Sequence, residues 1–372
     1  MKILLLTTHL DIGGIGIYTR NLARYIKREG MDVAVASSGG DLAASLKEGG
    51  IEHFHLDIRT KTELGYKVWK ALPQLVKLIK NNGFDLIHAQ TRVAQVLACF
   101  AGKVTGIPFI STCHGFFKYK RLGRKLFPCW GSKVIAISRN VQEHLENDFN
   151  FPSNRIALIY NGIELERFTS NPGVKDASLM RNLGLSEDKK IVGTIGRLSS
   201  VKGQKYLLEA FKKILNKNEE AELLIVGEGP EKGRLKGQIK EMGLEGKVFF
   251  SDGTDAPLEK YLSLIDIFCL PSLEEGLGLS LMEAMAAGCA CIASNIGGPS
   301  ELIENAETGM LVPPGDSEAL AEAMGRLFRE DIFRKALAEK ARTKALRDFA
   351  IEESALKTAE VYREVVSEDH GA

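Results

Sequence analysis

The sequence has few cysteines and no long hydrophobic run, and each of these features excludes a class of protein. Its six cysteines never occur as C-x-x-C, so the spacing of a disulfide framework or a zinc site is missing and we expect reduced thiols. No apolar run approaches the roughly 18 residues that span a bilayer. The four aliphatic residues after Lys2 are too few for the hydrophobic part of a signal peptide. We therefore expect a cytoplasmic chain without a transmembrane helix.

Two common nucleotide-binding motifs are also missing. The pattern G-x-x-x-x-G-K-[ST] does not occur, and neither the glycines at 13–16 nor those at 227–233 have the spacing G-x-G-x-x-G. These absences argue against a P-loop NTPase and against an NAD enzyme.

The composition, with 44% hydrophobic and 26% charged residues, is that of a globular protein. At about 150 residues per domain, a chain of 372 residues is expected to form two domains.

The net charge of +1 conceals an asymmetry between the two halves of the chain. Residues 1–160 hold 22 Lys and Arg against 12 Asp and Glu, a balance of +10, whereas residues 161–372 hold 27 against 36, a balance of −9. A split of this size suggests that the first half faces something anionic.

Short apolar, β-branched runs alternate with longer amphipathic stretches, which is the pattern of βα units around parallel sheets. The runs predict strands at 3–7, 33–36, 53–56, 86–89, 109–113, 134–137, 156–159, 191–195, 223–226, 248–250, 267–270, 291–293 and 310–312. We therefore expect an α/β protein of two Rossmann-like, doubly wound domains, 1–165 and 166–350, facing each other across a cleft. Turn signals at 161–162 and 171–173 bracket the boundary, and ligands are expected at the carboxyl ends of the strands.

The most informative stretch follows the strand predicted at 267–270. A loop with Gly276 and Gly278 leads into a run of helix formers that begins near Leu279 and ends at Gly288. Free N–H groups at such a helix start suit a phosphate, and glycines let a ligand approach the backbone. Glu283, about one turn into the helix, can accept two hydrogen bonds from the diol of a ribose. Glu275, on the loop, can accept from hydroxyls of a second polar group.

A second group of charges follows the strand predicted at 191–195. Arg197 and Lys202 lie between Gly196 and Gly203 and would supply a planar fork and a point charge to a diphosphate at the same sheet edge. Simpler interpretations stay open. Glu283 could merely complement the helix N-terminus. Arg197, Lys202 and Glu275 could be solvated side chains on loops.

The first domain offers weaker signals. The glycines of Gly13-Gly14-Ile15-Gly16 permit contact with phosphate or sugar, but they also suit a tight strand-to-helix turn. His114 follows the strand predicted at 109–113 and would reach the cleft edge, and His9 is the next candidate. A lone histidine is more often structural.

Taken together, these segments resemble the retaining glycosyltransferases of family 4, also called group 1, which have the GT-B fold. The matching segments occur in the family's order over nearly the whole chain and are far more specific jointly than singly. They are 13–16, 114–115, 137–138, 161–163, 196–198, 202–203, 226–230, 271–288 and 297–301.

The resemblance implies a role for several of the matching positions. Glu283 would hold the ribose of a nucleotide-sugar donor, Arg197 and Lys202 its diphosphate, and Glu275 its sugar, while His114 would line the reaction centre. It also implies that a C-terminal helix within 351–372 crosses back to the first domain. Leu277 stands where a Phe is more usual. The implied catalytic residues are His114, Glu275, Arg197 and Lys202, and the implied donor contacts are Gly14, Gly16, Arg197, Lys202, Glu275, Gly276, Leu277, Gly278, Leu279, Ser280, Leu281 and Glu283.

The implied activity is transfer of a hexose-type sugar, with retention, from a UDP-sugar to a glycan or lipid-linked acceptor in the synthesis of cell-surface polysaccharide, lipopolysaccharide or glycolipid. Negative charge that develops on the leaving diphosphate would be stabilised by Arg197, Lys202 and the helix N-terminus. No D-x-D motif is present, so we expect neither a metal nor another cofactor. Two alternatives are a nucleotide-sugar 2-epimerase and a non-catalytic protein that binds sugar nucleotides.

Part of the positive charge of the first half is concentrated at 116–130, where cations alternate with aromatics. Such a segment suits an anionic lipid surface, and we expect a peripheral contact with the inner face of the cytoplasmic membrane. A solvated basic helix or an anionic soluble acceptor would give the same pattern. Nucleic acid is not expected as a partner, because no recognised binding motif accompanies the patch. The cations concerned are Lys118, Lys120, Arg121, Arg124 and Lys125.

Overall fold

A computed structural model describes residues 1–117, 128–169, 175–217 and 220–370. The chain divides into two compact units: unit 1 comprises Met1–Gly162 with Ile351–Ala372, and unit 2 comprises Ile163–Ala350. The first division falls three residues before the one predicted at 165/166. Ile163 belongs with unit 2 because its N–H donates to the carbonyl of Phe349, 2.9 Å away, and the residue pairs with Ala350.

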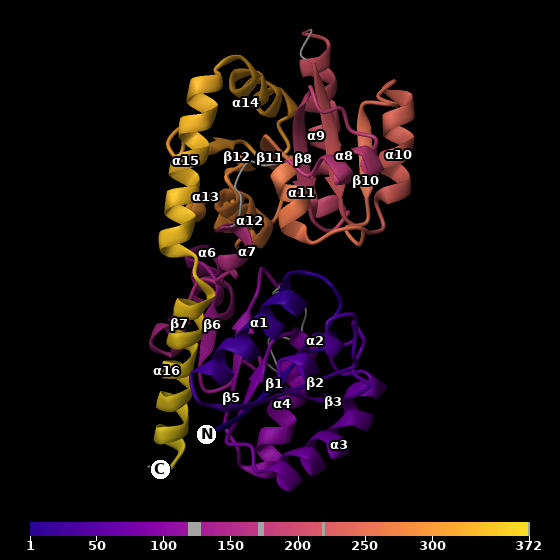
Figure 1. The fold of residues 1–372 in the computed structure, drawn as a ribbon. Helices are drawn as coiled ribbons and strands as arrows, with labels where there is room; N and C mark the ends of the chain where they lie inside the picture. Colours follow the sequence, from indigo (N-terminus) through magenta and orange to yellow (C-terminus); the bar gives the residue numbers. More distant parts are fainter. Residues whose placement is uncertain (118–127, 170–174, 218–219, 371–372) are drawn as a thin grey trace. The chain divides into compact units, whose positions relative to one another are not determined.

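Unit 1 is built on a parallel sheet with the strand order β3-β2-β1-β4-β5-β6-β7 (Figure 1). The strands are β1 (Lys2–Leu6), β2 (Asp32–Ser37), β3 (Glu52–His55), β4 (Leu86–Ala89), β5 (Phe109–Cys113), β6 (Val134–Ala136) and β7 (Ile156–Leu158). The helices are α1 (Gly14–Arg28), α2 (Ala43–Glu48), α3 (Tyr66–Asn82), α4 (Arg92–Thr105), α6 (Arg139–Phe149), the 3₁₀ turn η1 (Ser153–Arg155) and α16 (Ile351–His370).

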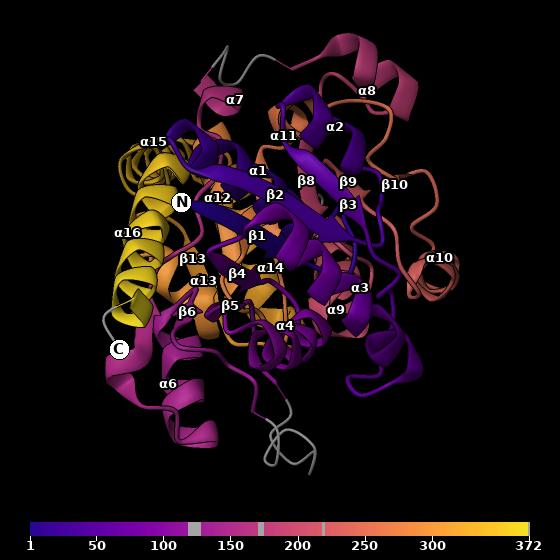
Figure 2. The same cartoon turned by 90° about the horizontal axis from the view of Figure 1, so that it is seen from below.

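Strand β1 shows why this sheet is buried on both faces. Its unbroken aliphatic run sends alternate side chains to opposite sides of the sheet. Ile3 and Leu5 belong to a core that includes residues of α1 and α16, whereas Leu4 and Leu6 belong to a second core with α3 and α4. The helices α3 and α4 lie side by side (Figure 2).

The last helix, α16, is part of unit 1 and packs against α1. Ile351, Ala355, Ala359 and Tyr362 of this helix are at most 1% exposed and belong to the same core as Ile3. Their spacing places them along one helical stripe. A segment that follows all of unit 2 in the sequence therefore completes the core of unit 1.

Unit 2 has a parallel sheet with the strand order β10-β9-β8-β11-β12-β13. Its strands are β8 (Lys190–Ile195), β9 (Ala221–Val226), β10 (Val248–Ser251), β11 (Ile267–Leu270), β12 (Ala290–Ser294) and β13 (Met310–Val312). Its helices are α7 (Glu166–Thr169), α8 (Ala177–Leu183), η2 (Ser200–Lys202), α9 (Gln204–Leu215), α10 (Lys232–Glu241), α11 (Leu258–Leu264), α12 (Leu279–Ala287), α13 (Gly297–Leu302), α14 (Ser317–Arg329) and α15 (Asp331–Asp348).

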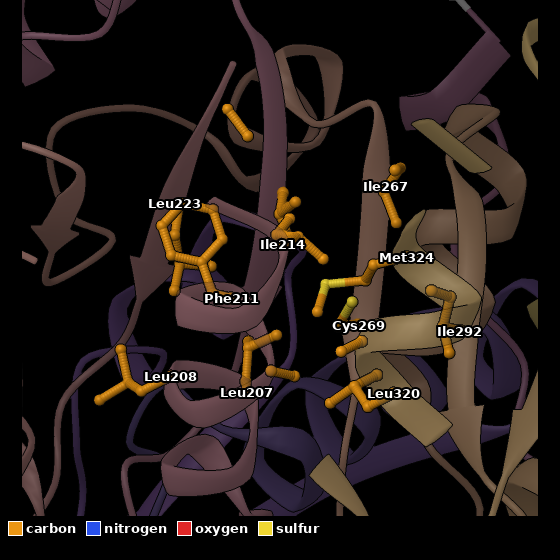
Figure 3. Packing of buried hydrophobic residues seen from close by; sticks show 14 of the residues in the cluster. Leu207, Leu208, Phe211, Ile214, Leu223, Ile267, Cys269, Ile292, Leu320 and Met324 are labelled. Atoms are coloured by element: carbon orange, nitrogen blue, oxygen red, sulfur yellow. The ribbon is translucent and has the colours of Figure 1, made fainter. Parts of the chain in front are cut away.

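The core of unit 2 lies between its sheet and helices α9 and α14. Phe211 and Ile214 of α9 converge with Met324 of α14 on the strands, among them Cys269 of β11 (Figure 3). The observed sheets confirm the predicted α/β architecture of two parallel sheets. The short helix α7 was not predicted, because the turn-rich stretch around it has no clear period.

Candidate functional site

The predicted donor residues of unit 2 follow two neighbouring strands. Strand β8 pairs in parallel with β11, so the loops after Ile195 and after Leu270 leave the same edge of the sheet. Arg197 and Lys202 lie on the first loop, while Glu275 lies on the second. The topology therefore brings together residues that are far apart in the sequence.

The loop after β8 is held by close backbone contacts that only glycine permits. The N–H of Leu198 donates to the carbonyl of Glu228 at 2.8 Å. A Cβ on Gly229, whose φ is +156°, would lie 2.2 Å from the carbonyl oxygen of Leu198. Arg197, which precedes Leu198 in the sequence, is exposed. Within the described part of the chain its guanidinium has no ion-pair or hydrogen-bond partner. The group is therefore available to a ligand.

The loop after β11 is bonded to the turn that carries Lys202. The N–H of Leu273 donates to the carbonyl of Val201 at 2.7 Å. Gly203, in the left-handed region at φ +68°, approaches so closely that a Cβ there would lie 1.9 Å from the carbonyl oxygen of Pro271. This junction fixes Lys202 relative to the loop that bears Glu275.

Lys202 and Glu275 form an ion pair with each other, through Nζ and Oε2. The side chains are 25% and 14% exposed, respectively. The hydroxyl of Ser272 donates to the same carboxylate oxygen at 3.3 Å. The sequence predicted that each of the paired residues contacts a ligand, and it gave no sign that they contact one another.

Helix α12 begins where that loop ends. Gly278 precedes it with φ +103°, and no side chain caps the helix N-terminus. The first N–H groups of such a helix have no intrahelical partner and can bind an anion. Glu283 lies one turn into α12 and is 8% exposed, so little of its side chain is open to solvent.

The backbone of the glycine loop is covered by α13. A Cβ on Gly298 would lie 2.1 Å from the Cα of Leu277, and its N–H donates to the carbonyl of Glu275 at 3.4 Å. Leu277 and Leu281 are buried side chains, 2% and 0% exposed. Their predicted donor contacts can therefore come only from the backbone, whereas Leu279 and Ser280 are half-buried.

In unit 1, the predicted glycine loop begins helix α1. Gly14 is exposed, and a Cβ on the preceding Gly13 would meet nothing within 4 Å. Gly16 is required for packing instead, because a Cβ there would lie 2.3 Å from the carbonyl oxygen of Asp11. The loop thus has one open glycine position and one that shapes the turn.

His114 follows β5 and is held by two neighbours. Its Nε2 lies 2.9 Å from Oε1 of Gln90, and its ring contacts that of Tyr18 edge-on at 5.3 Å between centroids. Burial lowers the pKa of His114 to about 3, so the imidazole is neutral at physiological pH. Gln90 directly follows β4, just as His114 follows β5, and this shared position is a signal that sequence reasoning could have used.

The predicted membrane-contact residues Lys118, Lys120, Arg121, Arg124 and Lys125 lie outside the described residues. Elsewhere in the chain, none of the described helices combines the length and hydrophobicity that crossing a bilayer requires. Among the described residues, no cluster of three or more His, Cys, Asp or Glu side chains is placed to hold a metal ion.

Two family models match the chain, one in each part. Residues 12–167 match the model described as Glycosyltransferase Family 4, and residues 176–344 match Glycosyl transferases group 1. An uncharacterised glycosyltransferase of Methanocaldococcus jannaschii is 25% identical over 385 aligned residues, covering 98% of both chains.

A relative with a named activity comes from Escherichia coli. It is UDP-Gal:alpha-D-GlcNAc-diphosphoundecaprenol alpha-1,3-galactosyltransferase, 28% identical over 315 residues, covering 81% of this chain and 80% of that protein. Among solved structures, HepE of Anabaena in complex with UDP and glucose has a TM-score of 0.83 at 24% identity, covering 97% and 99% of the two chains. These matches extend over both units, and the two parallel sheets with their flanking helices form the GT-B fold. The chain therefore belongs to the family 4, or group 1, glycosyltransferases and is a glycosyltransferase.

Proposed function

We propose that the protein transfers a hexose-type sugar, with retention of its anomeric configuration, from a UDP-sugar to a glycan or lipid-linked acceptor in cell-surface polysaccharide, lipopolysaccharide or glycolipid synthesis. The observation that carries the proposal is the gathering of Arg197, Lys202 and the uncapped start of α12 at the edge where β8 and β11 end. An unpartnered guanidinium and uncapped helix N–H groups at the same sheet edge suit a diphosphate.

The same groups account for the chemistry. Breaking the bond between the anomeric carbon and the phosphate oxygen leaves negative charge on the nucleoside diphosphate. Arg197, Lys202 and the N–H groups of α12 would stabilise that charge, and loss of one such contact costs about 3 kcal/mol in the transition state. Retention follows if the acceptor attacks from the side that the phosphate leaves, which requires no protein nucleophile. The neutral His114 would line the reaction centre as a hydrogen-bonding group rather than as a cation.

The choice of donor base and acceptor has separate support. The Escherichia coli relative is named for UDP-galactose and for an acceptor with a diphosphoundecaprenol lipid.

The proposal includes no metal or other cofactor, because the two cations and the helix N-terminus are suited to the charge of the diphosphate. Transfer that persists unchanged in excess EDTA is the expected result, and loss of transfer that Mg²⁺ or Mn²⁺ restores would contradict it.

A thermal-shift screen against UDP-, GDP- and ADP-sugars tests the donor assignment. At about 100 times its dissociation constant, a donor should stabilise the protein by about 2.7 kcal/mol. Glu283→Ala should sharply reduce the shift, because it removes the proposed ribose contact. NMR of the product then tests retention, and a product with inverted anomeric configuration would contradict the proposed reaction.

The proposal extends to contact with an anionic membrane, and helices α3 and α4 support it. Helix α3 holds four exposed lysines and no acidic residue, and α4, which also has no acidic residue, adds the exposed Lys103. Tyr66 and Trp69 of α3 are 77% and 45% exposed, and the Trp69 ring lies 4.8 Å from that of Phe100 on α4. Exposed Tyr and Trp beside lysines are typical of surfaces that contact lipid headgroups.

Sedimentation with vesicles of phosphatidylglycerol or phosphatidylcholine tests this contact. We expect binding to the anionic vesicles only, weakened by Tyr66→Ser with Trp69→Ser and by Lys70→Ala with Lys77→Ala. A matched control is Lys236→Ala with Lys240→Ala, two exposed lysines of α10 in unit 2. Equal sedimentation of all these variants, or equal binding to both lipids, would exclude α3 as the contact.

A further inference from the structure

The ion pair between Lys202 and Glu275 joins two residues to which the proposed function gives different ligand groups. Lys202 is assigned to the diphosphate and Glu275 to the sugar, yet their side chains form an ion pair with each other. Arg197, the other proposed diphosphate contact, has no such partner among the described residues. The two cations of the site are therefore not equivalent, since only one of them is already neutralised.

A diphosphate that reaches Lys202 must compete with Glu275 for it. Both side chains are mostly buried, at 25% and 14% exposed, so neither is fully solvated when its partner leaves. The carboxylate that stays behind also repels the anionic phosphates nearby. Binding of a nucleoside diphosphate alone thus leaves Glu275 with a negative charge and one partner fewer.

A nucleotide sugar changes this balance because the sugar brings hydroxyl donors. Hydroxyls can replace the ammonium of Lys202 as hydrogen-bond partners of the carboxylate. A free nucleoside diphosphate has no group in that position. The ion pair therefore weakens binding of the nucleoside diphosphate product more than it weakens binding of the nucleotide-sugar donor.

We propose that Glu275 discriminates between donor and product: its ion pair with Lys202 is exchanged for sugar hydroxyls when the donor binds, and it re-forms as the nucleoside diphosphate leaves. This inference rests on the proposed function, which assigns Lys202 to the diphosphate and Glu275 to the sugar. It adds that the charge of Glu275 weakens binding of the nucleoside diphosphate, although the residue belongs to the binding site.

Ser272 is a positioning residue in this exchange. It is fully buried, and its hydroxyl donates to Oε2 of Glu275 at 3.3 Å. When Lys202 turns to the diphosphate, this bond remains as the carboxylate's hydrogen bond within the described part of the chain, so it limits the penalty when no sugar replaces the ammonium. Nothing in the sequence pattern had marked Ser272 as part of the site.

Glu275→Gln tests the inference because removing the charge of this binding-site residue is predicted to strengthen, not weaken, binding of the nucleoside diphosphate. Titration calorimetry on the full chain would compare whichever of UDP, GDP and ADP the wild type binds best with the corresponding nucleotide sugar. The variant should bind the nucleoside diphosphate about fivefold more tightly, the size of a released partly exposed ion pair. Its affinity for the nucleotide sugar should gain less or fall. Glu274→Gln, an exposed neighbour on the same loop, should change neither.

Ser272→Ala keeps the charge pair and provides a second measurement should Glu275→Gln fail to fold. Ser272→Ala should favour binding of the nucleotide sugar over the nucleoside diphosphate, which is opposite to the effect of Glu275→Gln. Without the Ser272 hydroxyl, the carboxylate released by Lys202 has only the sugar hydroxyls as partners. Unchanged or weaker binding of the nucleoside diphosphate to Glu275→Gln, or an unchanged ratio in Ser272→Ala, would overturn the inference.

Arg197→Ala separates that failure from failure of the proposed function. If Arg197→Ala weakens nucleoside diphosphate binding while Glu275→Gln does not strengthen it, the diphosphate site stands and only the exchange is wrong. If the wild type binds none of the three nucleoside diphosphates, or Arg197→Ala binds as the wild type does, the diphosphate assignment fails and the inference fails with it.

Discussion

Nδ1 of His88 lies 2.6 Å from the hydroxyl of Tyr362, although 274 positions separate the two residues in the chain. His88 is on the central strand β4 and Tyr362 is on α16, so this hydrogen bond ties the last helix to the sheet of unit 1. The other ring nitrogen of His88 lies 2.7 Å from the hydroxyl of Thr112. All three side chains are at most 1% exposed.

Tyr362→Phe should destabilise unit 1, because it leaves a ring nitrogen of His88 buried without a partner. Such a loss costs about 1–3 kcal/mol. Both tryptophans of the chain, Trp69 and Trp130, belong to unit 1, so the change in the urea midpoint can be followed by tryptophan fluorescence. Arg363→Ala, an exposed neighbour on α16, serves as the control. Equal midpoints for Tyr362→Phe and the wild type would show that the bond does not hold the helix.

The stability of unit 1 should fall as the pH drops below neutrality. Burial lowers the pKa of His88 to about 3, whereas an unfolded histidine titrates near 6.5. Below that value the unfolded state binds a proton that the folded state does not, so the free energy of unfolding decreases with falling pH.

Between pH 7 and 5 we expect His88 to contribute a loss of about 2 kcal/mol, above the range in which carboxylates titrate. Urea midpoints followed by tryptophan fluorescence at pH 7, 6 and 5 measure this loss. The variant His88→Gln should show a shallower dependence on pH whatever its absolute stability. A dependence as steep as that of the wild type would contradict the assignment.

Gly203→Ala should damage both stability and ligand binding in unit 2. The residue has φ +68°, and a Cβ would lie 1.9 Å from a backbone oxygen of Pro271, so the junction between the two site loops must open. We expect a loss of about 1–3 kcal/mol in the free energy of unfolding and weaker binding of the donor. Gly237→Ala in helix α10, where a Cβ meets nothing within 4 Å, should be neutral or slightly stabilising. Similar melting of the two variants would contradict this account of Gly203.

Gln90→Leu separates turnover from donor binding. Gln90 contacts Nε2 of His114 at 2.9 Å, and both residues are in unit 1, whereas the proposed diphosphate contacts are in unit 2. We expect kcat to fall about tenfold or more, with the dissociation constant of the nucleoside diphosphate unchanged. Transfer assays with titration calorimetry measure the two quantities. A parallel loss of nucleotide affinity would point to a general structural defect instead.

The central strands were predictable because they are buried on both faces and therefore appear as apolar runs between turn signals, as at 3–7 and 267–270. Two glycine positions of the proposed donor site were predictable for another reason, since Gly203 and Gly278 have backbone conformations that other residues rarely adopt. Partner choice could not be predicted. Nothing local to Lys202 shows that Glu275 is its partner, and Tyr362 appears in the sequence only as one aromatic residue of an amphipathic helix.

Binding of nucleoside diphosphates to the wild type and to Arg197→Ala tests the central claim most directly, that the edge formed by β8, β11 and α12 binds a donor diphosphate. Titration calorimetry should show wild-type binding of UDP weakened by tenfold or more in Arg197→Ala. Arg181→Ala, which removes an exposed arginine on α8 of the same unit, should leave it unchanged. Equal affinity of the wild type and both variants would contradict the account.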